Sequence, residues 1–263
     1  MAKALALIFL YLFLSFNVSA KRTYKIALSS SCPYYCTEEN HKKGYIVDLL
    51  DLFFKKHGIK VKFETTPYAR LYDNLKSGVS DLALFTSLDV RNHSNFIIYD
   101  VTLGVSSAGI VSRTGTNPVV LDFIDLKDKI LFLTPGSKAS EIIYNEVGKL
   151  NKDSSSIQLI TGSRIHDRLI DLVALGRADY AIDDYNVLKY FYSKSAKKNK
   201  VVLTPTSISG YNPLKFVSSK SLPIQSIIEK DLNKFVEQYR KSGKLQILLK
   251  KYNIIDWNIV LTR

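Results

Sequence analysis

The sequence predicts an α/β fold made of two similar halves, each with its own small parallel sheet. Short apolar segments alternate with amphipathic ones in two successive runs, which is the order of parallel β–α–β units. Segments 75–83 and 173–181 also share an aliphatic residue, Gly, Asp and Ala at identical spacing. The alternative is that this likeness is a general one, because helix–glycine–strand junctions look alike in many α/β proteins.

The first run supplies three strands and two helices. Strands are expected at 25–28, 60–65 and 81–85, and helices at 45–56 and 69–77. The helix at 45–56 has one continuous apolar face, formed by Ile46, Val47, Leu49, Leu50, Phe53 and Phe54. Gly44 precedes this helix, and Gly58 and Gly78 end the two helices.

The second run repeats this order, and a helical tail follows it. Strands are expected at 129–133, 157–160 and 179–182, and helices at 140–150 and 164–175. Gly176 stands where a helix C-cap needs a left-handed residue. Segment 222–252 reads as two amphipathic helices separated by Gly243. Because such helices would pack back on one half, that half is expected to contain both ends of the chain.

The composition is that of an ordinary globular protein. Of the 263 residues, 46% are hydrophobic and 23% are charged, and only two are Cys. These values exclude disorder, a collagen-like repeat and a cysteine-dense scaffold. The formal net charge of +13 favours anionic partners in general. The sequence has no phosphate-binding loop and no zinc or serine-hydrolase motif, so we expect no cofactor and no metal.

The first twenty residues read as an export signal. Lys3 precedes an apolar run from Leu5 to Phe16, and Val18-Ser19-Ala20 fits a cleavage site. The run is shorter than the roughly 20 apolar residues that cross a bilayer. The alternative is an uncleaved membrane anchor.

The two cysteines lie close together in Cys32-Pro-Tyr-Tyr-Cys36. An even number of cysteines in an exported chain favours a disulfide, here one that closes a small loop. A redox-active pair usually has two intervening residues rather than three. A metal site would need further ligands, for which His41 is the only nearby candidate.

Five motifs, in order along the chain, resemble the bacterial periplasmic solute-binding proteins of family 3, the polar amino acid type. They are Gly44-Tyr-Ile-Val-Asp48, Pro67-Tyr68-Ala-Arg70-Leu, Leu75-x-x-Gly78-x-x-Asp81, Thr86-Ser-Leu-Asp-Val-Arg91 and Gly176-x-x-Asp179. The resemblance implies the type II periplasmic binding protein fold, in which two α/β lobes joined by two hinge strands close over a ligand. It places lobe 1 at 21–104 plus 207–263 and lobe 2 at 105–206.

The resemblance also implies how a ligand carboxylate would be held. Arg91 and Thr86 have the family's spacing for the residues that bind it, and the planar guanidinium of Arg suits both carboxylate oxygens. The alternative for Arg91 is a surface arginine in a polar loop. In lobe 2, the segment from Thr134 through Ser137 to Ser140 joins a strand to a helix, whose free N–H groups would face an anion. Lys138 either adds to this contact or is solvated.

An acidic residue after the last lobe-2 strand pairs with the ligand's ammonium group in the family. Asp184 has this position, although its neighbour Asp183 is the alternative partner. Asp184 could instead cap the helix that follows it. The family's usual acidic residue after the first strand is replaced here by the Ser29-Ser30-Ser31 run, which leaves an ammonium group fewer partners.

Apolar and aromatic side chains are expected to line the rest of the cleft. Tyr34, Tyr35 and Tyr68 are the aromatic candidates, and Leu84 is the aliphatic one. Arg70 either faces the cleft, where it would favour a more acidic ligand, or pairs with Asp73 one helical turn away.

The function that the resemblance implies is capture of a small polar ligand, an amino acid or related carboxylate, for an inner-membrane ABC permease. The protein would then be a periplasmic monomer that is not an enzyme and does not bind nucleic acid. One alternative is a receptor that presents the ligand to a sensor protein. Another is a dehydratase-like enzyme on the same fold, which would need an acid or base in the cleft.

Overall fold

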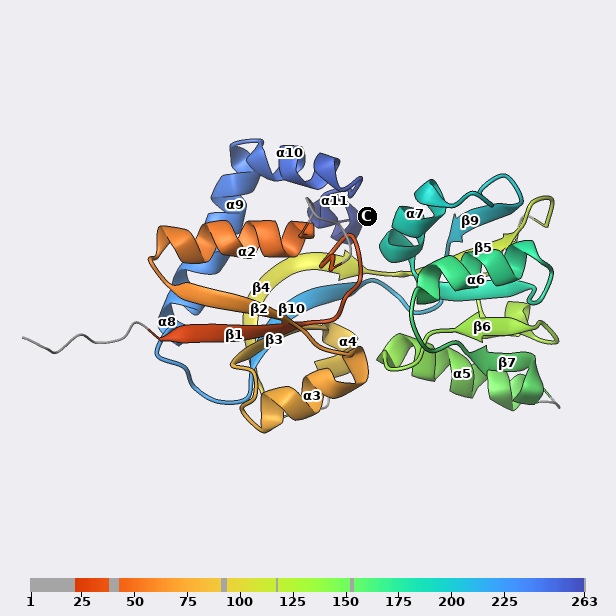
Figure 1. Cartoon of the computed structure of the whole chain (residues 1–263), viewed down its shortest axis with the longest axis horizontal. Coiled ribbons are helices and arrows are strands. Elements are labelled where there is room, and N and C mark those ends of the chain that lie inside the picture. The colour runs from red at the N-terminus through yellow and green to blue at the C-terminus, as the bar shows by residue number, and fades with distance from the viewer. Residues whose placement is uncertain (1–21, 38–42, 91–93, 117, 152–153, 263) are drawn as a thin grey trace, which may run out of the picture.

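The computed structural model describes residues 22–37, 43–90, 94–116, 118–151 and 154–262. In this part of the chain, two five-stranded mixed sheets form two lobes that lie side by side (Figure 1). The predicted α/β fold with two sheets is therefore confirmed. The predicted export signal at 1–20 lies outside the described residues.

Lobe 1 contains the sheet with strand order β2-β1-β3-β10-β4. Its strands are β1 (Thr23–Leu28), β2 (Lys60–Thr65), β3 (Leu82–Thr86), β4 (Ile97–Ser106) and β10 (Asn212–Ser218). Strands β1, β2 and β3 are parallel, and β10 runs antiparallel between β3 and β4. Because β10 follows the whole of lobe 2 in sequence, lobe 1 contains segments from both ends of the chain.

Lobe 2 repeats this arrangement with the order β7-β6-β8-β5-β9. Its strands are β5 (Ala108–Arg113), β6 (Leu131–Leu133), β7 (Ile157–Leu159), β8 (Tyr180–Asp184) and β9 (Val201–Pro205). Strands β6, β7 and β8 are parallel, and β5 is antiparallel to both β8 and β9. The two junctions that resemble each other in sequence lead into β3 and β8, which occupy the same place in their sheets.

Helices cover the faces of both sheets. Those of lobe 1 are α2 (Tyr45–Lys56), α3 (Tyr68–Lys76), α4 (Ser87–Val90), α8 (Gln225–Ile227), α9 (Asn233–Lys241), α10 (Lys244–Lys251) and α11 (Trp257–Leu261), with a π-helical turn at Ile228–Leu232. Those of lobe 2 are α5 (Lys138–Leu150), α6 (Ile165–Ala174) and α7 (Tyr185–Lys194), with short 3₁₀ turns at Phe123–Leu126 and Ser154–Ser156. Gly243 has a φ of 74° between α9 and α10, as the prediction of a break there requires.

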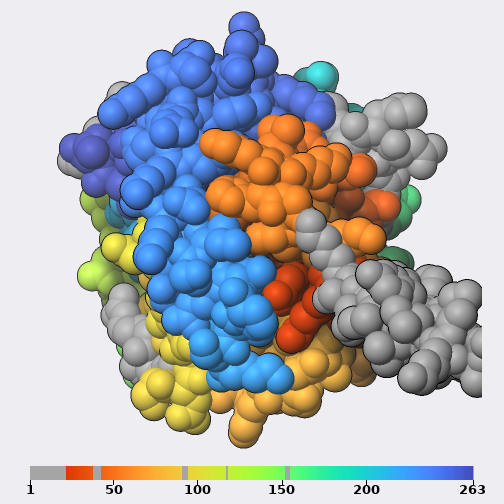
Figure 2. Space-filling view, turned by 90° about the vertical axis from the view of Figure 1, so that its left-hand side faces the viewer, coloured from red at the N-terminus to blue at the C-terminus, as the bar shows by residue number. Residues whose placement is uncertain are grey.

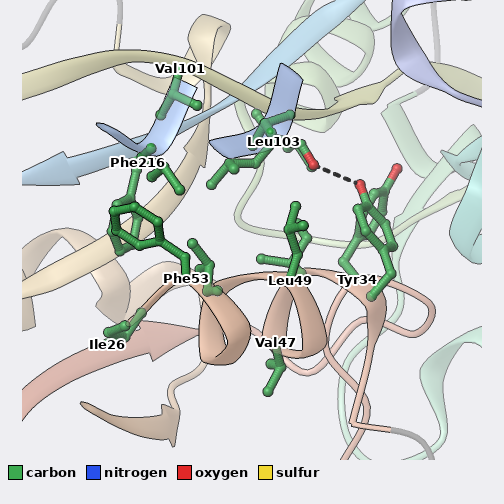
Figure 3. Packing of buried hydrophobic residues seen from close by; sticks show 14 of the residues in the cluster. Ile26, Tyr34, Val47, Leu49, Phe53, Val101, Leu103 and Phe216 are labelled. Atoms are coloured by element: carbon green, nitrogen blue, oxygen red, sulfur yellow. Dashed lines mark hydrogen bonds between the residues drawn. The ribbon is translucent and has the colours of Figure 1, made fainter. Parts of the chain in front are cut away.

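The larger core lies in lobe 1 between α2, the sheet and the C-terminal helices. Phe53 and Leu49 point from α2 toward Val101, Leu103 and Phe216 of the sheet (Figure 3). The space-filling view shows the C-terminal residues, in blue, against the N-terminal segment that contains α2, in orange (Figure 2). The apolar face predicted for 45–56 is thus buried by segments from both ends of the chain.

Two short connections join the lobes. The chain leaves the first sheet at Ser106 and enters the second at Ala108, and it returns between Pro205 and Asn212. The two crossings lie side by side between the lobes, because Ser106 pairs with Asn212 on one side of them and Gly109 pairs with Pro205 on the other (Figure 1). This connectivity is that of a two-strand hinge.

Candidate ligand-binding site

A cavity of about 580 Å³ lies between the lobes. It is lined by the carboxyl ends of parallel strands from both sheets and by the loops that follow them, including Leu28, Thr86, Thr134 and Asp184. Open α/β sheets bind ligands at this edge. The volume falls in the range of roughly 300–1,000 Å³ that is typical of small-molecule sites.

At one end of the cavity, the carboxylate of Asp89 joins the two lobes. In lobe 1, the Tyr68 hydroxyl and the Thr86 hydroxyl both donate to Asp89 Oδ2, and the Thr86 N–H donates to the same oxygen at 3.2 Å. From lobe 2, the backbone N–H of Lys138 donates to Asp89 Oδ1 at 2.8 Å. We call these four groups the Asp89 donors.

The Lys138 N–H belongs to the first turn of α5, where backbone N–H groups have no partner within the helix. Ser137 is the N-cap of this helix, and its hydroxyl accepts from the N–H of Ser140 at 3.1 Å. The predicted anion-facing helix end is therefore present, and the anion that it meets is a side chain of lobe 1. The ammonium group of Lys138 pairs with Glu141 at 2.7 Å, and Lys138 does not line the cavity.

Two adjacent carboxylates, Asp183 and Asp184, line the cavity near the hinge. Asp184 is the N-cap of α7 and accepts from the Val187 N–H at 2.9 Å, so the same residue lines the cavity and caps the helix that follows it. Asp183 accepts from the Thr134 hydroxyl at 2.9 Å and lies 3.2 Å from Nε2 of His166.

The two carboxyl groups differ in pKa. Burial raises the pKa of Asp184 to about 6, and the charge of Asp183 adds to this, although hydrogen bonds from Ser106, Val187 and Tyr34 oppose it. Burial acts in the same direction on Asp183, but its contacts with His166, the Asp184 N–H and Thr134 hold its pKa below the usual value. At neutral pH, both groups are therefore mainly ionised.

Tyr34 connects the loop after β1 to lobe 2. Its hydroxyl lies 3.0 Å from the carbonyl oxygen of Val105 and 3.1 Å from both carboxylate oxygens of Asp184. Because the hydroxyl has a single proton, it donates to one of these three oxygens at a time. Nδ2 of Asn186 donates to this hydroxyl at 3.0 Å. Burial and the charge of Asp184 raise the pKa of Tyr34 well above its usual value, so the hydroxyl stays a donor.

The loop that carries Tyr34 is closed by the predicted disulfide. Cys32 and Cys36 are bonded to each other, and the backbone of Ser31, just before Cys32, pairs with that of Tyr35. Gly44 packs against this loop with a φ of 97°, and a Cβ there would come within 2.2 Å of the Tyr34 carbonyl oxygen. The disulfide and this glycine together fix where Tyr34 meets the hinge.

The structure brings most of the sequence-predicted binding residues to one cavity. Its lining includes Tyr34, Tyr35, Tyr68, Leu84, Thr86, Thr134, Ser137 and Asp184. Arg70 is exposed on α3 and is not part of the lining. Arg91 lies outside the described residues, so its contact with a ligand carboxylate stays a prediction.

Sequence reasoning missed two of the titratable residues in this cavity. Asp89 follows Thr86 by three residues, a spacing typical of local side-chain to backbone turns, but its contact with the other lobe has no local signal. His166 lies on α6, where its ring stacks on Phe191 at 4.8 Å between ring centroids. It belongs to none of the recognised motifs and reaches Asp183 only through the packing of α6 beside β8.

The described lining residues differ in charge from the whole chain. Three carboxylates line it, and no Lys or Arg is present among the lining residues that the structure describes. In the same part of the chain, no group of three or more His, Cys, Asp or Glu side chains could hold a metal ion. None of its helices combines the length and apolarity needed to cross a membrane.

Known proteins resemble this chain over most of its length. Residues 24–254 match the family model of bacterial extracellular solute-binding proteins, family 3. A Vibrio harveyi protein named as an amino-acid ABC transporter-binding protein, PatH, is 27% identical over 173 residues, and the chain spans 64% of that relative's length.

Solved structures share the fold at low sequence identity. An ancestral arginine-binding protein bound to arginine has a TM-score of 0.67 and 20% identity, covering 88% of this chain and 99% of that one. A histidine kinase sensor domain with similarity to periplasmic binding proteins has a TM-score of 0.69 and 18% identity, covering 89% and 97%. The family match, with a cavity between two hinged lobes, shows that this chain belongs to the bacterial extracellular solute-binding proteins, family 3.

Proposed function

We propose that this protein captures a small polar solute in the cavity between its lobes and delivers it to an inner-membrane ABC importer from the periplasm. The observation that supports this most directly is the shared cavity, because each lobe contributes hydrogen-bonding groups to it and the chain passes between the lobes through two short connections. In this mechanism the solute is bound without covalent change. The protein acts as a monomer, and the importer recognises the closed form.

Closure of the lobes would couple ligand binding to recognition by the importer. The Asp89–Lys138 and Tyr34–Asp184 contacts cross between the lobes. A ligand that touches both lobes binds the closed form more tightly than the open one, so it shifts the population toward closure. An importer that docks on the closed form then responds to ligand occupancy.

The ligand that we propose is of amino-acid size and carries a protonated amine. Asp184 and Asp183 lie together at the hinge end of the cavity, where they would pair with an ammonium group, and Tyr34 and Tyr68 would enclose its carbon skeleton. The two aspartates therefore support the amine group of the expected ligand, an amino acid or related carboxylate. The predicted carboxylate-binding groups Thr86 and the α5 N-terminus already hold Asp89.

A receptor role is the second candidate, and the similarity to a histidine kinase sensor domain favours it. In that role the same closure would be presented to a sensor protein instead of a permease. Pull-down of membrane proteins with the ligand-bound form would separate the two, since a permease and a sensor kinase differ in their transmembrane and cytoplasmic parts.

A thermal-shift screen of the purified protein against amino acids, amines, dipeptides and organic acids tests the proposed function. A true ligand at 100 times its Kd should stabilise the folded state by about 2.7 kcal/mol. Asp184→Asn should remove this shift, whereas Asp51→Asn, a change on α2 outside the cavity, should keep it. The function is contradicted if no solute in the screen gives a shift that depends on Asp184.

A further inference from the structure

The end of lobe 2 that faces away from the cavity has a cluster of basic side chains. The carboxyl ends of β6 and β8 line the cavity, so the turns before these strands lie at the opposite end of the lobe, away from lobe 1 (Figure 1). Strand β5 ends there and β9 begins there, because β5 is antiparallel to both β8 and β9. The cations of these turns, which we call the basic end, are Arg113, Arg177, Lys197, Lys198 and Lys200.

Backbone contacts hold these turns side by side. The N–H of Thr114 donates to the carbonyl oxygen of Lys200 at 3.0 Å, and Arg113 pairs with Val201 in the sheet. The guanidinium of Arg113 also lies next to Gly176, since a Cβ on that glycine would come within 3.3 Å of its Nη1. Strands β8, β5 and β9 are neighbours in the sheet, so the cations extend over two strand spacings, or roughly 10 Å.

The cations of the basic end have no carboxylate partner within the described part of the chain. By contrast, Lys138, Lys149 and Arg164 of the same lobe each form an ion pair there. Segment 185–206 contains five Lys and no Asp or Glu. All five cations except the half-buried Lys197 are exposed. Their charge is therefore available to an anionic partner.

The surroundings of the basic end are basic and partly apolar. Two carboxylates, Asp128 and Asp179, precede β6 and β8 at the same end of the lobe, and two further cations, Lys127 and Lys129, offset them. Leu175, at the C-terminal end of α6, is 65% exposed. Cations beside an exposed aliphatic side chain are the combination that binds the surface of a bilayer.

We propose that the basic end binds the anionic headgroups of a phospholipid bilayer, with Leu175 entering the boundary between headgroups and acyl chains. Cations that extend over roughly 10 Å match an array of headgroups better than a single small anion. The cavity lies at the other end of the lobe, so a solute reaches it while the protein is on the membrane. This docking surface does not depend on the proposed solute binding.

Flotation of the full chain with lipid vesicles tests this proposal. At 0.05 M NaCl, vesicles of phosphatidylglycerol and phosphatidylcholine should bind the protein about tenfold or more tightly than vesicles of phosphatidylcholine alone. At 0.5 M NaCl this preference should disappear, because salt screens exposed charges. Equal binding to both kinds of vesicle at low salt would overturn the proposal and indicate an apolar contact, such as one made by Leu5 to Phe16. Binding to neither kind would overturn it as well.

A triple variant locates the contact. Arg113→Gln, Lys198→Gln and Lys200→Gln together remove three exposed cations of the basic end. Each Lys or Arg near an anionic surface contributes about fivefold to binding, so we expect the variant to bind anionic vesicles about 100-fold more weakly. Leu175→Gln alone should weaken binding about fivefold. Unchanged binding of the triple variant would overturn the proposal, and unchanged binding of Leu175→Gln would exclude Leu175 from the contact.

The matched control removes the same charge from exposed positions of lobe 1. It combines Lys60→Gln, Lys76→Gln and Lys244→Gln, and it should bind anionic vesicles within about threefold of the wild type. An equal loss in the control would show that the net charge of the chain, and not the basic end, causes the binding. Both triple variants should keep the wild-type Tm and the thermal shift that a solute gives, so the membrane contact and the solute-binding function are tested separately.

Discussion

Asp184→Asn is expected to stabilise the empty protein at neutral pH and to lose this effect in acid. Burial raises the pKa of Asp184 from an ordinary 3.8 to about 6, so the ionised carboxylate is disfavoured in the folded state. A raised pKa means that the folded state holds this proton more tightly than the unfolded state does. The penalty is therefore absent below about pH 4, grows as the pH rises to 6, and is complete above that.

The size of the effect follows from the shift. About two pKa units correspond to about 3 kcal/mol, which is an upper limit for the gain when the charge is removed. The amide loses part of this gain, because it accepts less well from the Val187 N–H and the Tyr34 hydroxyl. We expect a net stabilisation of about 1–2 kcal/mol at pH 7.5, or a Tm higher by about 2–8 °C.

Urea denaturation at pH 4, 5, 6 and 7.5 measures this directly in the absence of ligand. The difference in unfolding free energy between Asp184→Asn and the wild type should shrink toward zero or change sign by pH 4. Asp51→Asn should show no such trend. A difference between Asp184→Asn and the wild type that is the same at all four pH values would show that burial of the charge is not its cause.

Four further outcomes follow from the site. The affinity for a cationic ligand should fall about tenfold per pH unit below pH 6 in calorimetry, because protons compete for Asp184. Gly44→Ala should destabilise the fold by more than 2 kcal/mol in urea denaturation through its clash with the Tyr34 loop, whereas Gly148→Ala, a helical site with open space, should be neutral or stabilising. Replacing both Cys32 and Cys36 by Ser should cost about 2 kcal/mol, as expected for so small a loop, in the same assay. Arg91→Ala should remove the thermal shift that a carboxylate ligand gives, and an unchanged shift would exclude Arg91 from the site.

Strong local patterns in the sequence predicted the fold well. The helix predicted at 45–56 and the strand at 60–65 have those bounds in the structure, because an apolar helical face and a strict alternation identify each one. Local patterns in the sequence do not identify strands β4, β5, β9 and β10, although the resemblance implies hinge strands. The hydrogen bonds of β10 with β3 and β4 depend on a chain reversal through the other lobe, which local periodicity does not encode.

The sequence predicts those residues of the candidate site that are placed in the cleft by the strand to which they belong. Asp184 ends a strand whose carboxyl end faces the cleft, and Thr86 does so in the other lobe. Asp89 and His166 depend on contacts between elements that are distant in sequence, so neither spacing nor residue type pointed to them. The net charge favours anionic partners in general, but a sum over the chain does not say which charges line the cavity.

The contrast between the basic chain and the three carboxylates among the described lining residues leads to a prediction about salt. The chain as a whole has a net charge of +13, which repels a cation approaching from a distance. At about 0.15 M salt this repulsion is screened beyond roughly 8 Å, whereas attraction by carboxylates within the cavity is screened much less. The association rate of a cationic ligand, measured by stopped-flow fluorescence, should therefore rise a few-fold between 0.01 and 0.15 M salt, with a nearly constant dissociation rate. An association rate that falls over this range would mean that the surface charges near the cleft opening already attract cations, and that the excess of Lys and Arg lies elsewhere on the molecule.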